Sequence, residues 1–163
     1  MMALAVFDID GVLADVQHRL HHVSSRPKQW AAFFAAADAD GLLSPGADLL
    51  HAMEPTHEIR YLTGRPERLR HVTTHWLVRQ GLPEAQLVMR PNRDFRASRD
   101  FKRDHLQRWL AEGAQIALVV DDDPQVAAMV TALGLTVVQA DWQHTPPTAQ
   151  QTLWQVQEDL GRS

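Results

Sequence analysis

The sequence predicts an α/β fold in which a doubly wound, mostly parallel sheet of five strands is covered by helices on both faces. Two observations carry this prediction. Five short apolar runs alternate with segments of helical periodicity along the 163 residues, and this alternation is typical of parallel sheets. Three of the runs end in acids or in a threonine–glycine pair. Polar groups therefore gather at one edge of the sheet, where ligands bind in such folds.

The first expected strand, Ala3–Ile9, is a short apolar run, which is typical of a strand buried on both faces. It ends in acids. The segment Asp15–Ser44 follows it and is too long for a tight turn but too short for a domain. We interpret this segment as a small lid, a loop with one helix over Lys28–Ala37, rather than a full cap domain. The next helix, Pro45–Met53, begins with a proline suited to a first helical turn.

The second expected strand, Glu58–Leu62, stops at a threonine–glycine pair. The helix Pro66–Gln80 is expected next, again with proline in its first turn, and Gly81 is its natural stop. A third strand is expected over Gln86–Met89, and a helix over Asp100–Ala111 follows it.

The fourth expected strand, Ile116–Val120, again ends in acids. The helix Pro124–Leu133 follows and is closed by Gly134. The fifth strand is the short run Leu135–Gln139, and a last helix is expected over Pro147–Leu160.

Composition fits one globular domain over residues 1–163, with 45% hydrophobic and 22% charged residues. The chain has no cysteine, which excludes disulfides, thiolate zinc sites and cysteine nucleophiles. No apolar run approaches the roughly 20 residues of a membrane helix, and the short apolar start lacks a basic leader. We therefore expect a cytoplasmic protein with no membrane partner. Its oligomeric state is not predicted.

The acids of Asp8-Ile9-Asp10-Gly11 follow the first strand with one residue between them, so both point the same way. A buried strand that ends in two like charges needs a compensating cation, and oxygen ligands suit magnesium. Asp121, Asp122 and Asp123 follow the fourth strand and need the same compensation. The alternatives are a solvated loop for the first acids and an acidic helix start before Pro124 for the second group.

The run Thr63-Gly64-Arg65-Pro66 offers a hydroxyl, a glycine amide and an expected helix N-terminus, which together make an anion site. Arg65 can add a bidentate phosphate contact. The alternative is that Thr63 is only a helix cap. Lys102 lies in a basic stretch that opens a helix, and by itself it is unremarkable.

Four motifs follow one another along the chain: DIDG at 8–11, LTGR at 62–65, Lys102, and VVDDD at 119–123. In this order they resemble the four motifs of the haloacid-dehalogenase superfamily. The resemblance implies a phosphatase in which Asp8 attacks phosphorus and becomes an aspartyl phosphate, while Asp10 acts as general acid and then base. Thr63 and Lys102 would neutralise phosphate charge. It implies Mg²⁺ as the cofactor, with ligands from Asp8, the main-chain carbonyl of Asp10, Asp121 and Asp122.

A closer resemblance covers residues 8 to 123, through Leu62–Glu67, Thr74-His-Trp-Leu, Leu87-Val-Met-Arg-Pro, Asp94, Arg96 and Lys102. These residues look like the phosphatase domain of phage-type polynucleotide kinase–phosphatase, which removes 3′-phosphates from nucleic-acid ends or nucleotides. This chain contains no GxxxxGK[ST] loop, so no kinase domain is expected in it. It has Val12 where that family commonly has threonine, and its lid also differs.

The charge distribution favours an anionic substrate. Residues 65–108 hold eleven Lys and Arg against five acids, a net charge of +6 in a chain of −4. We expect the substrate to be a phosphorylated nucleotide or nucleic-acid end. The candidate contacts are Gly64, Arg65, Arg90, Arg93 and Arg96, with His18 and Arg19 reaching the leaving group from the lid.

Several alternatives remain open on sequence alone. A small-molecule phosphatase, such as a 5′-nucleotidase or a sugar phosphatase, has the same motifs. A receiver-like phospho-acceptor domain also combines acids, a threonine and a lysine, although in a different order. The lid histidines can be zinc ligands, or only part of a solvated surface.

The aromatic residues Trp30, Phe33 and Phe34 are expected in the core, and the alternative is that they stack on a nucleobase. Trp76 and Trp109 are also expected in the core. Trp142 and Trp154 have no assigned role.

Overall fold

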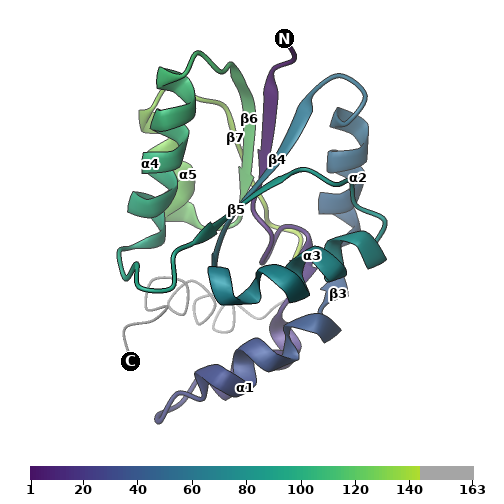
Figure 1. Ribbon diagram of the computed structural model, residues 1–163, viewed down its shortest axis with the longest axis vertical. Helices are drawn as coiled ribbons and strands as arrows, with labels where there is room; N and C mark the ends of the chain where they lie inside the picture. The colour runs from purple at the N-terminus through teal and green to yellow at the C-terminus, as the bar shows by residue number, and fades with distance from the viewer. Residues whose placement is uncertain (144–163) are drawn as a thin grey trace.

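The fold is that of a computed structural model, in which residues 1–143 are described. Five parallel strands form one sheet in the order β5-β4-β1-β6-β7 (Figure 1). The strands are β1 (Leu4–Phe7), β4 (Glu58–Pro66), β5 (Gln86–Arg90), β6 (Ile116–Asp121) and β7 (Val137–Gln139). All five strands expected from the sequence are present, and the predicted doubly wound α/β fold is confirmed.

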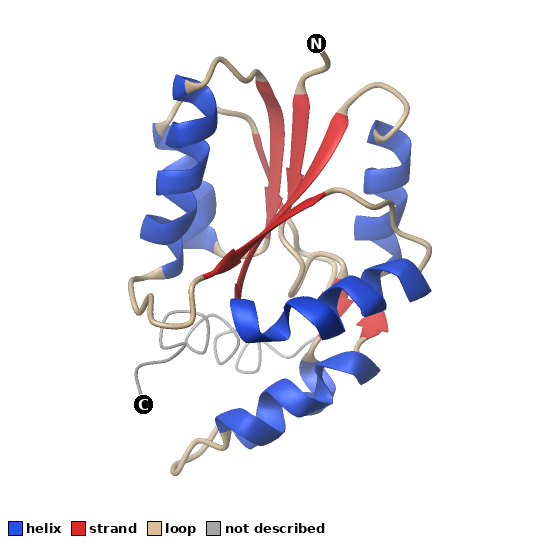
Figure 2. Ribbon diagram, viewed as in Figure 1, coloured by secondary structure: helices blue, strands red, loops and turns tan. Residues whose placement is uncertain are grey.

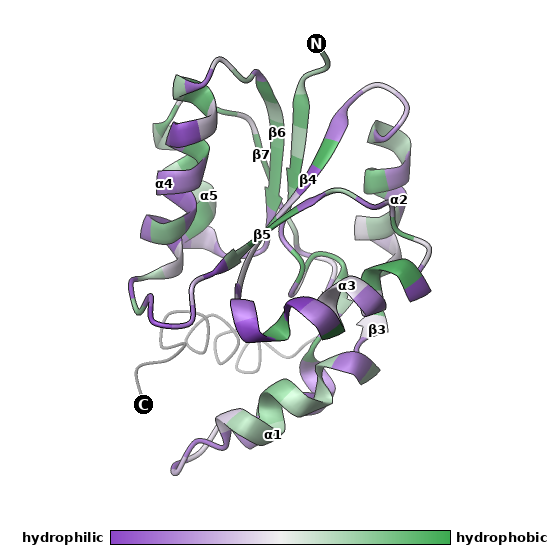
Figure 3. Cartoon of the chain, viewed as in Figure 1, coloured by the Kyte–Doolittle hydropathy of each residue, from purple (hydrophilic) through white to green (hydrophobic). Residues whose placement is uncertain are grey.

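Helices cover both faces of the sheet (Figures 1 and 2). Helices α2 (Ser44–Met53) and α3 (Arg70–Arg79) lie on one face, and α4 (Ser98–Ala111) and α5 (Pro124–Ala132) on the other. Alternate residues of β1 point to the two faces. Phe7 packs in the core on the α2 and α3 side, and Val6 packs with α4 and α5. The central strands β1 and β6 are therefore hydrophobic along most of their length (Figure 3), whereas β4 and β5 also carry hydrophilic residues.

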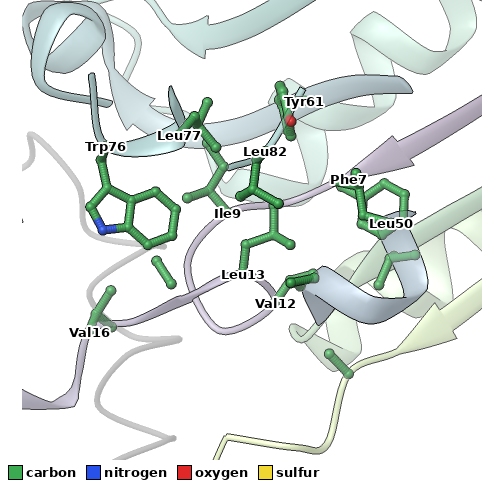
Figure 4. Packing of buried hydrophobic residues seen from close by; sticks show 14 of the residues in the cluster. Phe7, Ile9, Val12, Leu13, Val16, Leu50, Tyr61, Trp76, Leu77 and Leu82 are labelled. Carbon is green, nitrogen blue, oxygen red and sulfur yellow. The ribbon is translucent and has the colours of Figure 1, made fainter. Parts of the chain in front are cut away.

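The core on the α2 and α3 side extends past the end of β1 into the loop that follows it (Figure 4). Ile9, Val12 and Leu13 are fully buried there and share one cluster with Trp76 of α3. This packing fixes the loop that carries Asp8 and Asp10. Trp142 also braces the loop, because its indole Nε1 donates a 2.9 Å hydrogen bond to the carbonyl oxygen of Val12.

The lid between β1 and α2 has more structure than the sequence indicates. Two short strands, β2 (Ala14–Asp15) and β3 (Gly41–Leu42), pair antiparallel at its base. Between them lie the helix α1 (Trp30–Ala35) and two 3-10 helices, Gln17–His22 and Ala36–Ala39. The two-residue strands were not predicted, because a run that short shows no periodicity. The core assignment of Phe33 and Phe34 is confirmed, and Trp30 packs against them.

The predicted start of the helix Pro66–Gln80 is wrong. Strand β4 continues to Pro66, whose backbone is extended at φ −70° and ψ 152°. A 3-10 turn over Glu67–Leu69 follows, and α3 begins at Arg70. Proline suits an extended backbone as well as a first helical turn, and the prediction took only the second possibility.

The other expected elements differ from the structure by a few residues at their ends. Trp76 and Trp109 are buried, as expected. The expected helix Pro147–Leu160 and Trp154 lie outside the described residues. Among residues 1–143, no helix is both long and apolar enough to cross a membrane.

Candidate active site

Asp8 lies directly after β1, at the carboxyl end of the central strand. Its amide donates to the carbonyl of Val120 in β6 at 3.0 Å, which joins the two acidic loops. Its carboxylate Oδ1 accepts a 2.8 Å bond from the Ile9 amide and lies 3.3 Å from Lys102 Nζ. The side chain is 2% exposed, and nothing in residues 1–143 hydrogen-bonds its Oδ2. One oxygen of Asp8 is thus held in place while the other remains available.

The carboxylates of Asp8, Asp121 and Asp122 form one buried cluster, in which one oxygen from each lies within 4.8 Å of the others. Lys102 Nζ contacts this cluster at 2.6 Å from Asp121 Oδ2. Burial raises the pKa of Asp8 well above its ordinary value, Asp121 raises it further, and Lys102 opposes them. Three carboxylates against one ammonium leave a charge of −2, so an oxygen-binding divalent cation fits this donor set.

Gly11 is required where the chain turns away from Asp10. Its φ is +80°, and a Cβ atom there would lie 2.2 Å from Asp122 Oδ2. Both the backbone conformation and the close approach of Asp122 exclude a larger side chain. The turn thereby brings the loops after β1 and β6 into contact.

The three acids after β6 have different roles. Asp121 and Asp122 belong to the carboxylate cluster. Asp123 is instead the N-cap of α5, because its side chain accepts a 2.8 Å bond from the Gln125 amide. The helix-start alternative therefore holds for the third acid and not for the first two.

Asp10 is bound by arginine. Arg65 donates to Asp10 Oδ1 from Nε at 2.9 Å and from Nη2 at 2.6 Å. Arg19 of the lid donates to the same oxygen at 3.5 Å. Burial raises the pKa of Asp10, but Arg65 and Arg19 together lower it by more, so the net pKa lies below the ordinary value. The pairing favours the ionised form of Asp10 in the free protein.

Asp40, just before β3, is a second carboxylate that binds both arginines. Its carboxylate accepts bonds from Arg19 Nε at 2.8 Å and Arg65 Nη2 at 2.9 Å, and His18 Nε2 lies 2.7 Å from it. Its side chain is fully buried, and its main-chain carbonyl accepts a bond from Trp76 Nε1. Sequence reasoning missed Asp40. Nothing in the run Asp38-Ala39-Asp40-Gly41 distinguishes it from Asp38, which is half exposed.

Thr63 and Gly64 lie within β4 and not at a helix N-terminus, so this part of the predicted anion site is wrong. The Thr63 hydroxyl accepts a 3.1 Å bond from the Arg65 amide, which is a turn within the strand end and not a helix cap. Thr63 is 1% exposed. It lies at the carboxyl end of β4, next to β1 in the sheet, so it belongs to the same edge as Asp8.

The remaining candidate arginines separate into buried and exposed groups. Arg90 is 2% exposed, and its guanidinium donates to the carbonyls of Gly64, Asp94 and Arg96. Arg96 is 48% exposed and pairs with Asp94 at 2.8 Å and with Asp104. Arg93 is exposed on the same loop. Arg90 therefore holds this loop against β4.

The lid brings His18 and Arg19 to the site edge, but both bond to Asp40. The rings of His21 and His22 contact each other at a centroid distance of 4.0 Å. Within residues 1–143, the only group of three or more His, Asp or Glu side chains close enough to hold a metal ion is the cluster of Asp8, Asp121 and Asp122. The zinc alternative for the lid thus has no support from the geometry.

Lys102 projects from the second turn of α4 into the carboxylate cluster. Burial lowers its pKa, but Asp121 and Asp8 raise it by more, so Lys102 stays charged.

We expect Lys102→Ala to lower kcat on the order of 10²-fold, and more than it raises KM, because it removes a fixed cation from the site of developing charge. Steady-state kinetics measure both parameters. Arg103→Ala is the matched control, since Arg103 is 39% exposed and pairs with Asp100. A wild-type kcat in Lys102→Ala would mean that the assigned role is wrong.

Comparison with known proteins gives a family match. The family described as polynucleotide kinase PNKP phosphatase domain matches residues 3–143. No curated protein matches the chain.

Solved structures share the fold. Two structures of a Pnkp1/Rnl/Hen1 complex, one of them described as an RNA repair complex, each align with a TM-score of 0.72 at 22% identity. They cover 89% and 88% of this chain, which spans only 47% and 44% of those chains. A class C acid phosphatase from Bacillus anthracis with tungstate bound aligns at TM-score 0.66 and 17% identity, over 100% of this chain and 75% of its own.

A haloacid-dehalogenase-family enzyme from Bacteroides thetaiotaomicron, in complex with magnesium and inorganic phosphate, aligns at TM-score 0.53 and 10% identity. The alignment covers 90% of this chain and 98% of that one. At these identities the structural likenesses establish the fold alone.

Proposed function

This chain belongs to the family of polynucleotide kinase PNKP phosphatase domains, and from that premise we propose that it removes 3′-phosphates from nucleic-acid ends or nucleotides. The observation that carries the proposal is the buried carboxylate of Asp8. It is held beside Lys102 and the acids after β6, with one oxygen free of hydrogen bonds from the described residues. This arrangement suits an attack by the Asp8 carboxylate on the phosphorus atom of a negatively charged phosphate group.

In the first step, an oxygen of Asp8 forms a bond to phosphorus while the bond from phosphorus to the leaving 3′-oxygen breaks. The product on the protein is an aspartyl phosphate. Asp10 is ionised in the free protein, so it takes up a proton from solvent when the negatively charged phosphate binds beside it, and it passes this proton to the leaving oxygen. The hydrogen bonds from Arg19 and Arg65 to Asp10 reach Oδ1, so Oδ2 is the oxygen proposed to carry this proton.

In the second step, a water molecule attacks the phosphorus and releases inorganic phosphate, which regenerates the Asp8 carboxylate. Asp10, now ionised and paired with Arg65, takes the proton from that water. Lys102 offsets negative charge on the phosphoryl oxygens, and Thr63 offers its hydroxyl at the end of β4. The side chains that move protons and the side chains that offset charge are thus different groups.

Mg²⁺ is the cofactor proposed for the carboxylate cluster, and Asp8, Asp121, Asp122 and the main-chain carbonyl of Asp10 would hold it. When bound, it would supply positive charge that offsets the charge of the phosphoryl group. The charge of −2 on the cluster and the oxygen-only donor set support this choice over zinc.

The proposed substrate class rests on the family and on charge. Residues 65–108 carry +6, and part of that charge, such as Arg93, is exposed on the loop next to β4. The short lid leaves room for a polymer end to approach. The net charge of −4 restricts contact to one or a few nucleotides, so we expect a weak dependence of binding on salt.

The test is a comparison of kcat/KM with Mg²⁺ present, for a 3′-phosphorylated oligonucleotide, a 3′-mononucleotide, a 5′-mononucleotide and a sugar phosphate. We expect the 3′-phosphorylated substrates to be preferred by at least about tenfold, or about 1.4 kcal/mol of transition-state binding. Excess chelator is expected to remove the activity. A tenfold preference for the 5′-mononucleotide or the sugar phosphate would instead support a small-molecule phosphatase. The family assignment leaves no support for the receiver-like alternative.

A further inference from the structure

Two exposed arginines lie on neighbouring loops at the carboxyl ends of the strands. Arg68 is in the 3-10 turn between β4 and α3, and Arg93 is in the loop between β5 and α4. A hydrogen bond joins the two loops, because the Arg68 amide donates to the Asn92 side chain at 2.9 Å. Figure 1 shows the start of α3 next to this loop. The two arginines therefore belong to one surface of the molecule.

The acids next to these two arginines in sequence do not offset their positive charge, because other arginines bind those acids. Glu67 forms its ion pair with Arg70, at 2.8 Å. Asp94 forms its closest ion pair with Arg96, also at 2.8 Å. Within residues 1–143, no ion pair joins an acid to either of the two exposed arginines. Their uncompensated positive charge can therefore attract an anion.

An aromatic ring of the lid holds the guanidinium of Arg68 in position. The central carbon of this guanidinium lies 4.7 Å from the centroid of the Phe34 ring, and Phe34 is itself only 7% exposed in α1. Stacking on a ring uses the face of a guanidinium and leaves the N–H groups at its edge free to bind a phosphate. Because the side chain is already held, binding a phosphate there costs less conformational entropy.

A series of side-chain contacts connects Arg68 to Asp10 of the candidate active site. The rings of Phe33 and Phe34 are neighbours, with centroids 5.5 Å apart. The Arg19 guanidinium lies 4.3 Å from the centroid of the Phe33 ring, and it donates to Asp10 Oδ1 at 3.5 Å. Arg68 therefore lies within reach of a short strand whose end occupies the site. A basic side chain at such a place is suited to the backbone of a single strand.

We propose that Arg68 and Arg93 bind a phosphodiester group of the substrate strand, close to the 3′-phosphate that the enzyme removes. This inference rests on the proposed function, because it names a second part of the same substrate. A sugar phosphate or a 3′-mononucleotide has no phosphodiester group and cannot make this contact. The two arginines therefore favour strand ends over small phosphomonoesters, and they take no part in the chemical step.

The experiment compares kcat/KM for a 3′-phosphorylated tetranucleotide with kcat/KM for the same strand carrying an uncharged methylphosphonate at each linkage in turn. An exposed ion pair changes kcat/KM by roughly threefold. In the wild type, neutralising the linkage that both arginines bind should therefore lower kcat/KM by roughly tenfold. Arg68→Met, which keeps an apolar side chain against Phe34, and Arg93→Ala should each reduce this preference to roughly threefold. The double variant should show no preference for the charged strand.

Arg79→Ala is the matched control, because Arg79 is 43% exposed at the other end of α3 and pairs with Asp38. It should keep the wild-type preference for the charged strand. Arg93 is exposed, so Arg93→Ala provides the test even if Arg68→Met does not fold. Equal preferences in the wild type and the arginine variants, or a wild type indifferent to every methylphosphonate, would overturn this subsite alone. Failure of the wild type to hydrolyse any 3′-phosphorylated strand would overturn the proposed function, and this inference with it.

Discussion

Replacing Asp8 with asparagine is expected to abolish phosphatase turnover and to leave the fold intact. The amide is close in shape but cannot attack phosphorus, and no other carboxylate in the described structure takes the same position after β1. Phosphate release from a 3′-phosphorylated oligonucleotide measures the effect. We expect a loss of at least about 10⁴-fold, as for removal of a nucleophile.

The fold should survive this substitution because the buried negative charge of Asp8 destabilises the folded protein when no ligand is bound. Burial and Asp121 both disfavour its charge, so a neutral isostere relieves repulsion as it loses the contact with Lys102. Urea unfolding of Asp8→Asn should give a free energy of unfolding no lower than that of the wild type. Wild-type turnover in a correctly folded Asp8→Asn protein would exclude Asp8 as the nucleophile.

Replacing Asp40 with alanine is expected to cost about 3–5 kcal/mol of unfolding free energy, the usual effect of removing one partner from a buried ion pair. Asp40 accepts from both Arg19 and Arg65, whose side chains are 1% and 2% exposed. Without it, Asp10 is the one carboxylate in the described residues that still pairs with these two buried guanidinium groups. Urea unfolding followed by circular dichroism measures the change.

Asp38→Ala is the matched control, two residues earlier in the same segment. Asp38 is 49% exposed and pairs with Arg79 at the surface, so its loss should cost only about 0–1 kcal/mol. Turnover should also fall in Asp40→Ala, because Arg65 loses one of the two carboxylates that hold it. If Asp40→Ala were no more destabilising than Asp38→Ala, the ion-pair network would not have the structural role assigned to it.

The sequence was most informative where a strand runs into acids. Apolar runs of four to seven residues located all five strands, and their carboxyl ends placed Asp8 and Asp121 at one edge of the sheet. The order of the strands follows from the pairing of β1 with both β4 and β6. A parallel sheet brings such residues together whatever their separation in sequence.

The arginines were less predictable, since sequence does not show which charges are buried. Arg90 and Arg93 look equivalent in the sequence, but Arg90 fixes a loop from beneath and Arg93 is exposed. Their difference depends on the carbonyl of Gly64, which only the folded chain brings near. Asp40 was missed for the same reason, because its partners lie 21 and 25 residues away in sequence.

The stereochemical course at phosphorus tests the central claim, covalent catalysis by Asp8, most directly. A 3′-phosphoryl group made chiral with oxygen isotopes is transferred to an acceptor alcohol by the magnesium-loaded wild-type protein, and the configuration of the product is determined. Two successive in-line displacements, first by Asp8 and then by the acceptor, predict net retention. Net inversion would mean a single direct displacement without an aspartyl phosphate, and it would contradict the mechanism.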